Sequence, residues 1–536
     1  MGMEQGFISL LYPTEEARAS AASGGLPNIS DAVCEELSLS SLIDLRNSSL
    51  SKYFTADPAV IRYRQAAVSD MLQNKEIGET LNRVLPILFD IAELRRLDTD
   101  RVSTGDSYLY SITEIELYIS CIETLRDGFS PIRDKVESEA FLHLFRVIFE
   151  LAESEYYKDL NEKLSSLASR IREVKSITVG VNLDEMLRPS GAGVISINSE
   201  PFKSGKVLDK ILRMSFRNDA MTCIASLVPF GKNEAQNRKE ALTSAFNGAI
   251  EEVFRSSVRA WRDIAGDYVL MSTDFLLKLL PEIEFMMRAS ELLNRLSENG
   301  NALTVPRLDE TSRKTFTAKG LYNPAVALKI QEPVVENDFS FDDNGRIFII
   351  TGPNRGGKSV ITCAVGIAQG MMQLGLPVPA TDATLSPVDA IFTHFPEGAD
   401  DTIDKGRLGE ECARLSEIFD AVTENSMILL DESLSSTGAY EASYIAKEIL
   451  AGFGAVGCRG IFSTHLHELA ASTEDINRTS LEKGGVRIDN LVAGMEEGRR
   501  SFQIERKKPD GKSYARDIAD KYGLSFDNII KKRDKN

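Results

Sequence analysis

Residues 352 to 359 form a glycine-rich loop whose composition suits phosphate binding. The segment fits the pattern G-x-x-x-x-G-K-[ST]. Glycines let backbone N–H groups close around a polyphosphate, the lysine reaches the β- and γ-phosphates, and the serine hydroxyl can bind Mg²⁺. We therefore predict a site for ATP and Mg²⁺ made by Gly352, Pro353, Asn354, Arg355, Gly356, Gly357, Lys358, Ser359 and Val360.

Two later segments carry groups that hydrolysis needs. The apolar run 427–430 ends in Asp431 and Glu432, so that one carboxylate can hold Mg²⁺ with Ser359 while the next activates the attacking water. A second apolar run, 460–463, leads to His465. We expect His465 to sense the γ-phosphate and to act in catalysis with Glu432 and Lys358.

These groups need a common support, and the surrounding patterns predict a sheet. Short apolar runs precede the loop (346–351), the acidic pair and the histidine, and a helix is expected over 360–374. Ligands of open α/β sheets bind at the carboxyl ends of the strands. The three segments should therefore meet at one sheet edge.

A metal site is the competing interpretation of His465 and His467, because two of the four histidines in the chain lie there. Neither a cysteine nor a third histidine stands at ligand spacing, so zinc is the weaker interpretation. The six cysteines are scattered without paired spacing, which is typical of reduced, mostly buried thiols.

In their order along the chain, these motifs resemble the MutS family of ABC-class ATPases. The resemblance covers about residues 320 to 536 and rests on segments 337–338, 350–354, 356–359, 378–380, 389–393, 400–401, 431–432 and 463–469. It implies a composite ATPase in which each nucleotide lies between two subunits. Lys358, Ser359, Asp431, Glu432 and His465 would act from one subunit, and a signature loop from its partner.

The sequence departs from the family pattern at three places. Arg355 stands where the family usually has methionine, and segment 433–438 replaces a Gly-Arg-Gly-Thr run. The expected serine-bearing signature loop instead contains Arg407, Leu408, Gly409 and Glu410. These changes bear on contacts with the partner subunit more than on the residues of the same subunit. Arg355 suits either a phosphate contact or a solvated position.

The N-terminal half is predicted to be helical. Apolar residues recur at three- and four-residue steps over 77–97, 108–129, 140–174, 240–265 and 269–296. Alternating β-branched runs at 176–183 and 192–198 predict a hairpin. Similarity to MutS implies that the helices are levers and the hairpin a shortened clamp; a plain helical bundle is the alternative.

The predicted fold class is a multidomain α plus α/β protein. We expect an N-terminal segment (1–45), a helical lever domain (46–305) with a reduced clamp insertion at 176–200, and a P-loop ABC-type ATPase domain (306–536) with a small C-terminal helical dimerisation element. The family's mismatch-recognition domain with its Phe-x-Glu motif has no counterpart in 1–45. We therefore expect a short member without that domain, and no direct mismatch recognition.

The net charge of −18 does not by itself favour nucleic-acid binding. Residues 158–239, however, contain fourteen Lys and Arg against nine Asp and Glu. Candidate DNA phosphate contacts are Arg188, Lys203, Lys206, Lys210, Arg213 and Arg217, although each also suits a solvated surface position.

We expect an ATP-hydrolysing homodimer that opens and closes around duplex or branched DNA, in repair or recombination, with a MutL-like protein as a possible partner. Neither a signal peptide nor a run of eighteen apolar residues is present, so a cytoplasmic location without a membrane is expected. The alternative is a nucleotide-gated scaffold for a protein or ribosome/RNA partner, with little ATP turnover. An SMC-like ATPase is less compatible, since long heptad arms are missing.

Overall fold

The computed structural model describes residues 7–22, 27–99, 106–172, 175–186, 189–201, 228–229, 274–330, 332–395, 407–496, 499–508 and 522. These residues belong to two compact units. The first unit falls within 1–8, 76–135 and 142–283, and the second within 9–75, 136–141 and 284–536. The division passes through three helices, namely α5 (Lys75–Thr99) directly after its first residue, α7 (Glu139–Glu153) and α11 (Asp274–Glu298).

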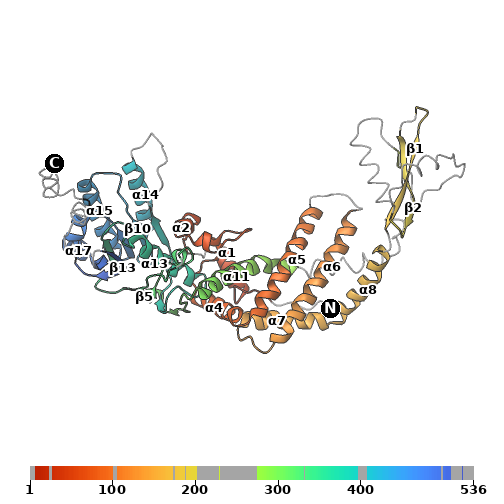
Figure 1. Cartoon of the computed structure of the whole chain (residues 1–536), viewed down its shortest axis with the longest axis horizontal. Coiled ribbons are helices and arrows are strands. Elements are labelled where there is room, and N and C mark those ends of the chain that lie inside the picture. Colours follow the sequence, from red (N-terminus) through yellow and green to blue (C-terminus); the bar gives the residue numbers. More distant parts are fainter. Residues whose placement is uncertain are drawn as a thin grey trace, which may run out of the picture. The chain divides into compact units, whose positions relative to one another are not determined.

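The first unit is mainly helical. Besides parts of α7 and α11, its elements are α5 (Lys75–Thr99), α6 (Asp106–Phe129), η2 (Ser130–Ile132), α8 (Glu155–Arg172), β1 (Ser176–Leu183), β2 (Pro189–Asn198) and β3 (Val228–Pro229). Helices α5 and α6 pack antiparallel, as Figure 1 shows, with Arg95 Nε 2.7 Å from Glu114 Oε1. Near the other end of the pair, a Cβ added at Gly128 would lie 2.2 Å from Thr80 Oγ1, so the helices approach closely there. The helices predicted over 77–97 and 108–129 are confirmed.

The prediction of a single helix over 140–174 is wrong, because α7 and α8 are separate helices. Ser154 stands between them, and its Oγ donates to the Leu151 carbonyl (2.7 Å) and accepts from the Tyr157 N–H (3.1 Å). A serine that caps the next helix in this way ends the first one, which the apolar periodicity alone does not reveal. Helix α11 confirms the prediction over 269–296 in its described part, and 240–265 lies outside the described residues.

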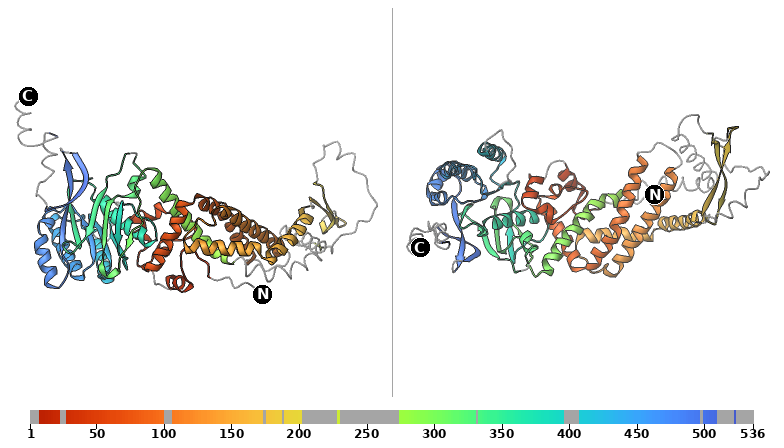
Figure 2. Two further views of the ribbon diagram at one scale, coloured as in Figure 1. Left: turned by 90° about the horizontal axis from the view of Figure 1, so that it is seen from below. Right: turned by 45° about the horizontal axis from the view of Figure 1, so that its top comes forward.

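The predicted hairpin is confirmed, and Figure 2 shows it following α8. Strands β1 and β2 are antiparallel, with Ser176 opposite Asn198 and Thr178 opposite Ser196. The Ser196 hydroxyl donates to Thr178 Oγ1 at 2.9 Å, which links the two strands through their side chains.

The second unit carries the α/β part of the protein. Its N-terminal elements are α1 (Glu15–Ala22), α2 (Asp31–Glu36), α3 (Leu39–Leu42), η1 (Leu50–Tyr53) and α4 (Pro58–Gln73). After α11 come β4 (Arg307–Leu308), η3 (Thr311–Arg313), β5 (Phe316–Leu321), α12 (Pro324–Ala327), β6 (Asn337–Phe341), β7 (Ile347–Thr351), α13 (Lys358–Gln373), β8 (Asp382–Leu385), β9 (Ile391–His394), α14 (Arg407–Ala421), β10 (Met427–Asp431), α15 (Ala439–Val456), β11 (Arg459–Ser463), α16 (His467–Ala471), α17 (Thr473–Glu482), β12 (Ile488–Glu496) and β13 (Arg499–Arg506).

Two sheets organise this unit. The larger has the order β13-β12-β7-β11-β10-β9 and is parallel except for β13. The smaller has the order β4-β8-β5-β6. Helices and a largely parallel sheet are thus combined in one chain, as the sequence predicted. Among the described residues, no helix is long and apolar enough to cross a membrane.

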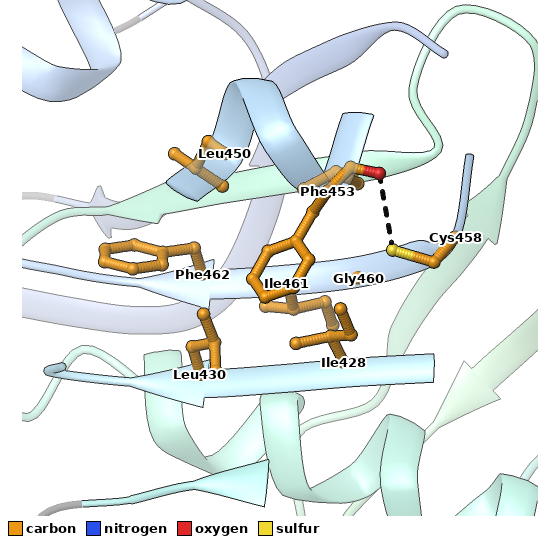
Figure 3. Close-up of a pocket in the computed structure, with 9 residues that line it drawn as sticks. Ile428, Leu430, Leu450, Phe453, Cys458, Gly460, Ile461 and Phe462 are labelled. Carbon is orange, nitrogen blue, oxygen red and sulfur yellow. Dashed lines mark hydrogen bonds between the residues drawn. The ribbon is translucent and has the colours of Figure 1, made fainter. Parts of the chain in front are cut away.

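Apolar side chains of β10 and β11 pack against α15. Figure 3 shows Leu430 of β10 and Phe462 of β11 near Leu450 and Phe453 of the helix. A cavity of about 10 Å³ remains between them, enough for one water at most, so it is a packing gap and not a ligand site. Burial raises the pKa of the neighbouring Cys458 thiol to about 12. The described cysteines are all free thiols.

Asp70, on α4, caps the chain before α7 and supplies a test of the fold. Its buried carboxylate accepts the N–H groups of Glu137 (3.1 Å) and Ser138 (2.8 Å). We expect Asp70→Ala to lower the free energy of unfolding by about 2–3 kcal/mol, because two backbone donors lose their acceptor. Urea denaturation of both proteins measures the difference in the free energy of unfolding. Arg62→Ala, at an exposed position of the same helix, is the control; equal stability of both variants contradicts the capping role.

Candidate active site

The predicted phosphate-binding loop joins β7 to α13. All five residues of β7 are buried, so the loop begins from a rigid strand. Gly352 and Gly357 have φ angles of 138° and 99°, which side-chain-bearing residues rarely adopt. A Cβ added at Gly352 would also lie 2.7 Å from Cβ of Ala493. These two positions therefore require glycine, and Lys358 and Ser359 follow at once in the first turn of the helix.

Lys358 is buried within its own loop. Its Nζ donates to the carbonyl oxygens of Gly352 and Pro353, both at 3.3 Å. Burial lowers the pKa of the ammonium group, while the nearby carboxylates of Glu432 and Asp431 raise it. Within the described part of the chain, the hydrogen-bond acceptors of this ammonium group are thus carbonyl oxygens, and the phosphates of a nucleotide would supply stronger ones.

Asp431 ends β10 and has an unsatisfied oxygen. Its side chain is buried, and Oδ1 has no hydrogen-bond partner among the described residues. Burial raises the pKa of this carboxyl, whereas hydrogen bonding to Ser359 and Ser463 lowers it. A carboxylate oxygen and a serine hydroxyl are hard oxygen ligands that Mg²⁺ prefers, and Mg²⁺ commonly uses one or two protein ligands together with phosphates. The residues present therefore fit the metal.

Glu432 and His465 form a pair. Nε2 of His465 lies 2.6 Å from Oε1 of Glu432, and the two side chains are 38% and 36% exposed. Glu432 has a left-handed backbone, with φ of 49°. Its N–H donates to the Ser463 carbonyl at 2.8 Å, which ties the acidic segment to the end of β11. The pair lies at the solvent boundary, where a nucleotide and a water molecule have access.

The sheet register explains why these segments meet. Ser463 of β11 is opposite Asp431 of β10 on one side and Ile350 of β7 on the other. Thr362 of α13 adds a side-chain link, because its Oγ1 lies 2.7 Å from Ser463 Oγ. The carboxyl ends of three neighbouring parallel strands therefore carry the loop, the acidic pair and the histidine, as expected from the sequence.

Comparison with known families agrees with this geometry. Residues 348–531 match the family described as MutS domain V, and residues 56–299 match the family described as MutS2 N-terminal domain. The first match includes the loop, the acidic pair and His465. The second includes helices α4 to α8, the hairpin and α11. The chain belongs to the MutS family.

Several curated relatives carry the name DNA mismatch repair protein MutS. The protein of Thermosipho melanesiensis is 31% identical over 255 residues, which are 44% of this chain and 30% of the relative. That of Chloroflexus aurantiacus is 34% identical over 227 residues, 41% of this chain and 22% of the relative. That of Prochlorococcus marinus is 34% identical over 176 residues, which are 31% of this chain and 18% of the relative. The chain thus matches less than a third of the length of these MutS proteins.

The residues predicted for a MutS signature loop lie in the first turn of α14. Leu408 is partly buried against the core between the larger sheet and α15. Gly409 and Glu410 are exposed, and a Cβ added at Gly409 would meet nothing within 4 Å. These two positions are open on the surface, while Leu408 packs inward.

Other predicted residues have mixed positions. Asn354 and Arg355 are exposed in the loop, and Arg355 has a φ of 59°. Val360 is 39% exposed, and its carbonyl accepts from Asn323 Nδ2 at 3.3 Å. The candidate DNA contacts lie outside the described residues, namely Arg188, Lys203, Lys206, Lys210, Arg213 and Arg217.

Some residues that border the candidate site were not predicted as site residues, although Asn337 belongs to a segment that resembles MutS. The side chain of Asn337 accepts a hydrogen bond from the Ile504 N–H (2.7 Å) and donates one to the Phe502 carbonyl (3.2 Å). These two bonds hold the backbone of β13 in place. Phe502 lies beside the loop, 3.7 Å from the Cβ position of Gly357. His394 and Ser433 form a second missed contact, at 2.7 Å. His394 had one available signal, since it ends an apolar run in a chain with four histidines.

Proposed function

We propose that this MutS-family protein binds ATP with Mg²⁺ and hydrolyses it. The observation that carries the proposal is the convergence of three groups at one sheet edge. These are the buried ammonium of Lys358, the unsatisfied Oδ1 of Asp431 and the contact between Glu432 and His465. A buried cation, a free carboxylate oxygen and a base within reach of solvent are the groups that phosphoryl transfer to water requires.

Each residue has a distinct role in the proposed reaction. Lys358 and the backbone amides of 354–359 bind the phosphates, and Ser359 and Asp431 hold Mg²⁺. When bound, Mg²⁺ offsets the negative charge of the phosphate oxygens. Glu432 accepts a proton from the attacking water, and His465 keeps the Glu432 carboxylate oriented and contacts the γ-phosphate.

The proposed assembly is a homodimer in the cytoplasm. In this proposal the exposed Gly409 and Glu410, with Arg407 and Leu408, approach the nucleotide of the partner subunit. The helical domain (46–305) with its hairpin insertion (176–200) acts as a lever on DNA, and the ATPase domain (306–536) drives it. Relatives named for DNA mismatch repair support a role in DNA repair, with a MutL-like protein as a proposed partner.

The test of DNA coupling is ATP turnover with duplex, mismatched and branched DNA at two salt concentrations. We expect one DNA form to stimulate turnover severalfold, and less so at the higher salt, because phosphate contacts release counterions. Glu432→Gln supplies the background rate. Turnover that is the same with every DNA form contradicts the proposal and favours the scaffold function, with a protein or RNA partner.

A further inference from the structure

His394, at the end of β9, makes a buried contact with the residue that follows Glu432. The residue is 3% exposed, and its Nδ1 lies 2.7 Å from Ser433 Oγ. The Ser433 hydroxyl donates to the His394 carbonyl at 3.2 Å. Because a hydroxyl has one proton, both contacts are hydrogen bonds at the same time when Nδ1 carries a proton and donates it to Ser433 Oγ. In this tautomer the two residues exchange two hydrogen bonds.

The backbone on both sides of Ser433 is strained. Glu432 and Leu434 have φ angles of 49° and 66°, although neither is glycine. Such left-handed conformations cost free energy and persist only where the surroundings hold them. Leu434 is held by burial in the core, and Glu432 by its N–H bond to the Ser463 carbonyl. The bonds to His394 hold the residue between them.

Charged groups from two helices surround His394. Burial lowers the pKa of the imidazole, and Arg414 of α14 lowers it further, while Glu411 of α14 and Glu36 of α2 raise it. Arg414 and Glu36 form an ion pair at 3.0 Å. A pKa below its usual value keeps the ring neutral at pH 7, which suits a fixed donor at Nδ1.

We propose that His394 is a positioning residue for ATP hydrolysis. Through Ser433 it holds the strained backbone of Glu432, so that the carboxylate stays against His465. The proposal rests on the proposed ATPase function and concerns the same site. It also gives α14 a route to the catalytic base, since the helix that begins with Arg407 carries the charges beside His394.

The first test compares steady-state ATP hydrolysis by wild type, His394→Ala, Ser433→Ala and the double variant. We expect each single variant to lower kcat roughly tenfold to a hundredfold with KM changed less than threefold, because a displaced catalytic group loses rate and not binding. The double variant should be no slower than the worse single variant. His394→Asn, which restores a donor near the position of Nδ1, should recover part of the rate. His143→Gln, on α7, is the control for loss of a histidine.

Unchanged kcat in folded His394→Ala and Ser433→Ala overturns the positioning role, as does an effect confined to KM. Thermal melting identifies variants that do not fold, and Ser433→Ala is the smaller change. A wild type without turnover instead contradicts the proposed ATPase. In that case the imidazole ¹H–¹⁵N spectrum tests the positioning role without turnover. The chain has four histidines, so the signals of each ring can be followed separately. We expect Ser433→Ala to shift the His465 signals as Glu432→Gln does; unmoved His465 signals in Ser433→Ala overturn the proposal.

Discussion

Replacement of Glu432 by glutamine is expected to lower the ATP hydrolysis rate by roughly a hundredfold to ten-thousandfold, the range for loss of a general base. Glutamine keeps the size and shape of the side chain but cannot accept a proton from water. It also keeps an oxygen that can face His465, which now lies 2.6 Å from the carboxylate. ATP binding should persist, because Lys358 and the loop are unchanged. Single-turnover hydrolysis and equilibrium ATP binding measure the two quantities separately.

The same variant should accumulate an ATP-bound closed dimer, which sedimentation with and without ATP detects. Glu448→Gln, at an exposed position of α15, is the matched control and should keep the wild-type rate. Normal turnover by Glu432→Gln would show that the base is another group. Loss of ATP binding along with turnover would place Glu432 in nucleotide binding instead of in the chemical step.

Lys358→Ala should abolish nucleotide binding, with affinity for ATP reduced about a hundredfold or more, equivalent to about 2.8 kcal/mol. The Lys358 ammonium is already buried in the loop, where two carbonyl oxygens at 3.3 Å are its hydrogen-bond acceptors. Phosphate oxygens would replace or add to these acceptors with charge-assisted bonds. Fluorescence titration with a labelled ATP analogue measures the loss.

The control is Lys319→Ala, which removes an exposed lysine from β5. It should bind ATP as the wild type does. Thermal melting of Lys358→Ala without nucleotide shows whether the two lost hydrogen bonds weaken the fold. An unchanged ATP affinity in a folded Lys358→Ala protein would contradict the assignment of the phosphate-binding loop.

Local patterns were sufficient for most elements that support the site. Residues close together in the sequence are enough to predict the buried strand 347–351, the glycine-rich loop after it and the helix from Lys358. The same holds for the hairpin, whose alternation is local. The break at Ser154 was missed because a cap depends on one side chain that the apolar periodicity does not include.

The sequence by itself determined which residues carry the chemistry, namely the loop with Lys358, the acidic pair and His465, because each motif lies within a few residues of its own strand. Only the tertiary structure decided which side chains touch. The contact between Glu432 and His465 spans 33 positions and that between His394 and Ser433 spans 39. Both depend on the order of β9, β10 and β11 and on their register. Apolar runs specify that strands exist but not which strands are neighbours, because any buried strand can pair with any other through the same backbone groups.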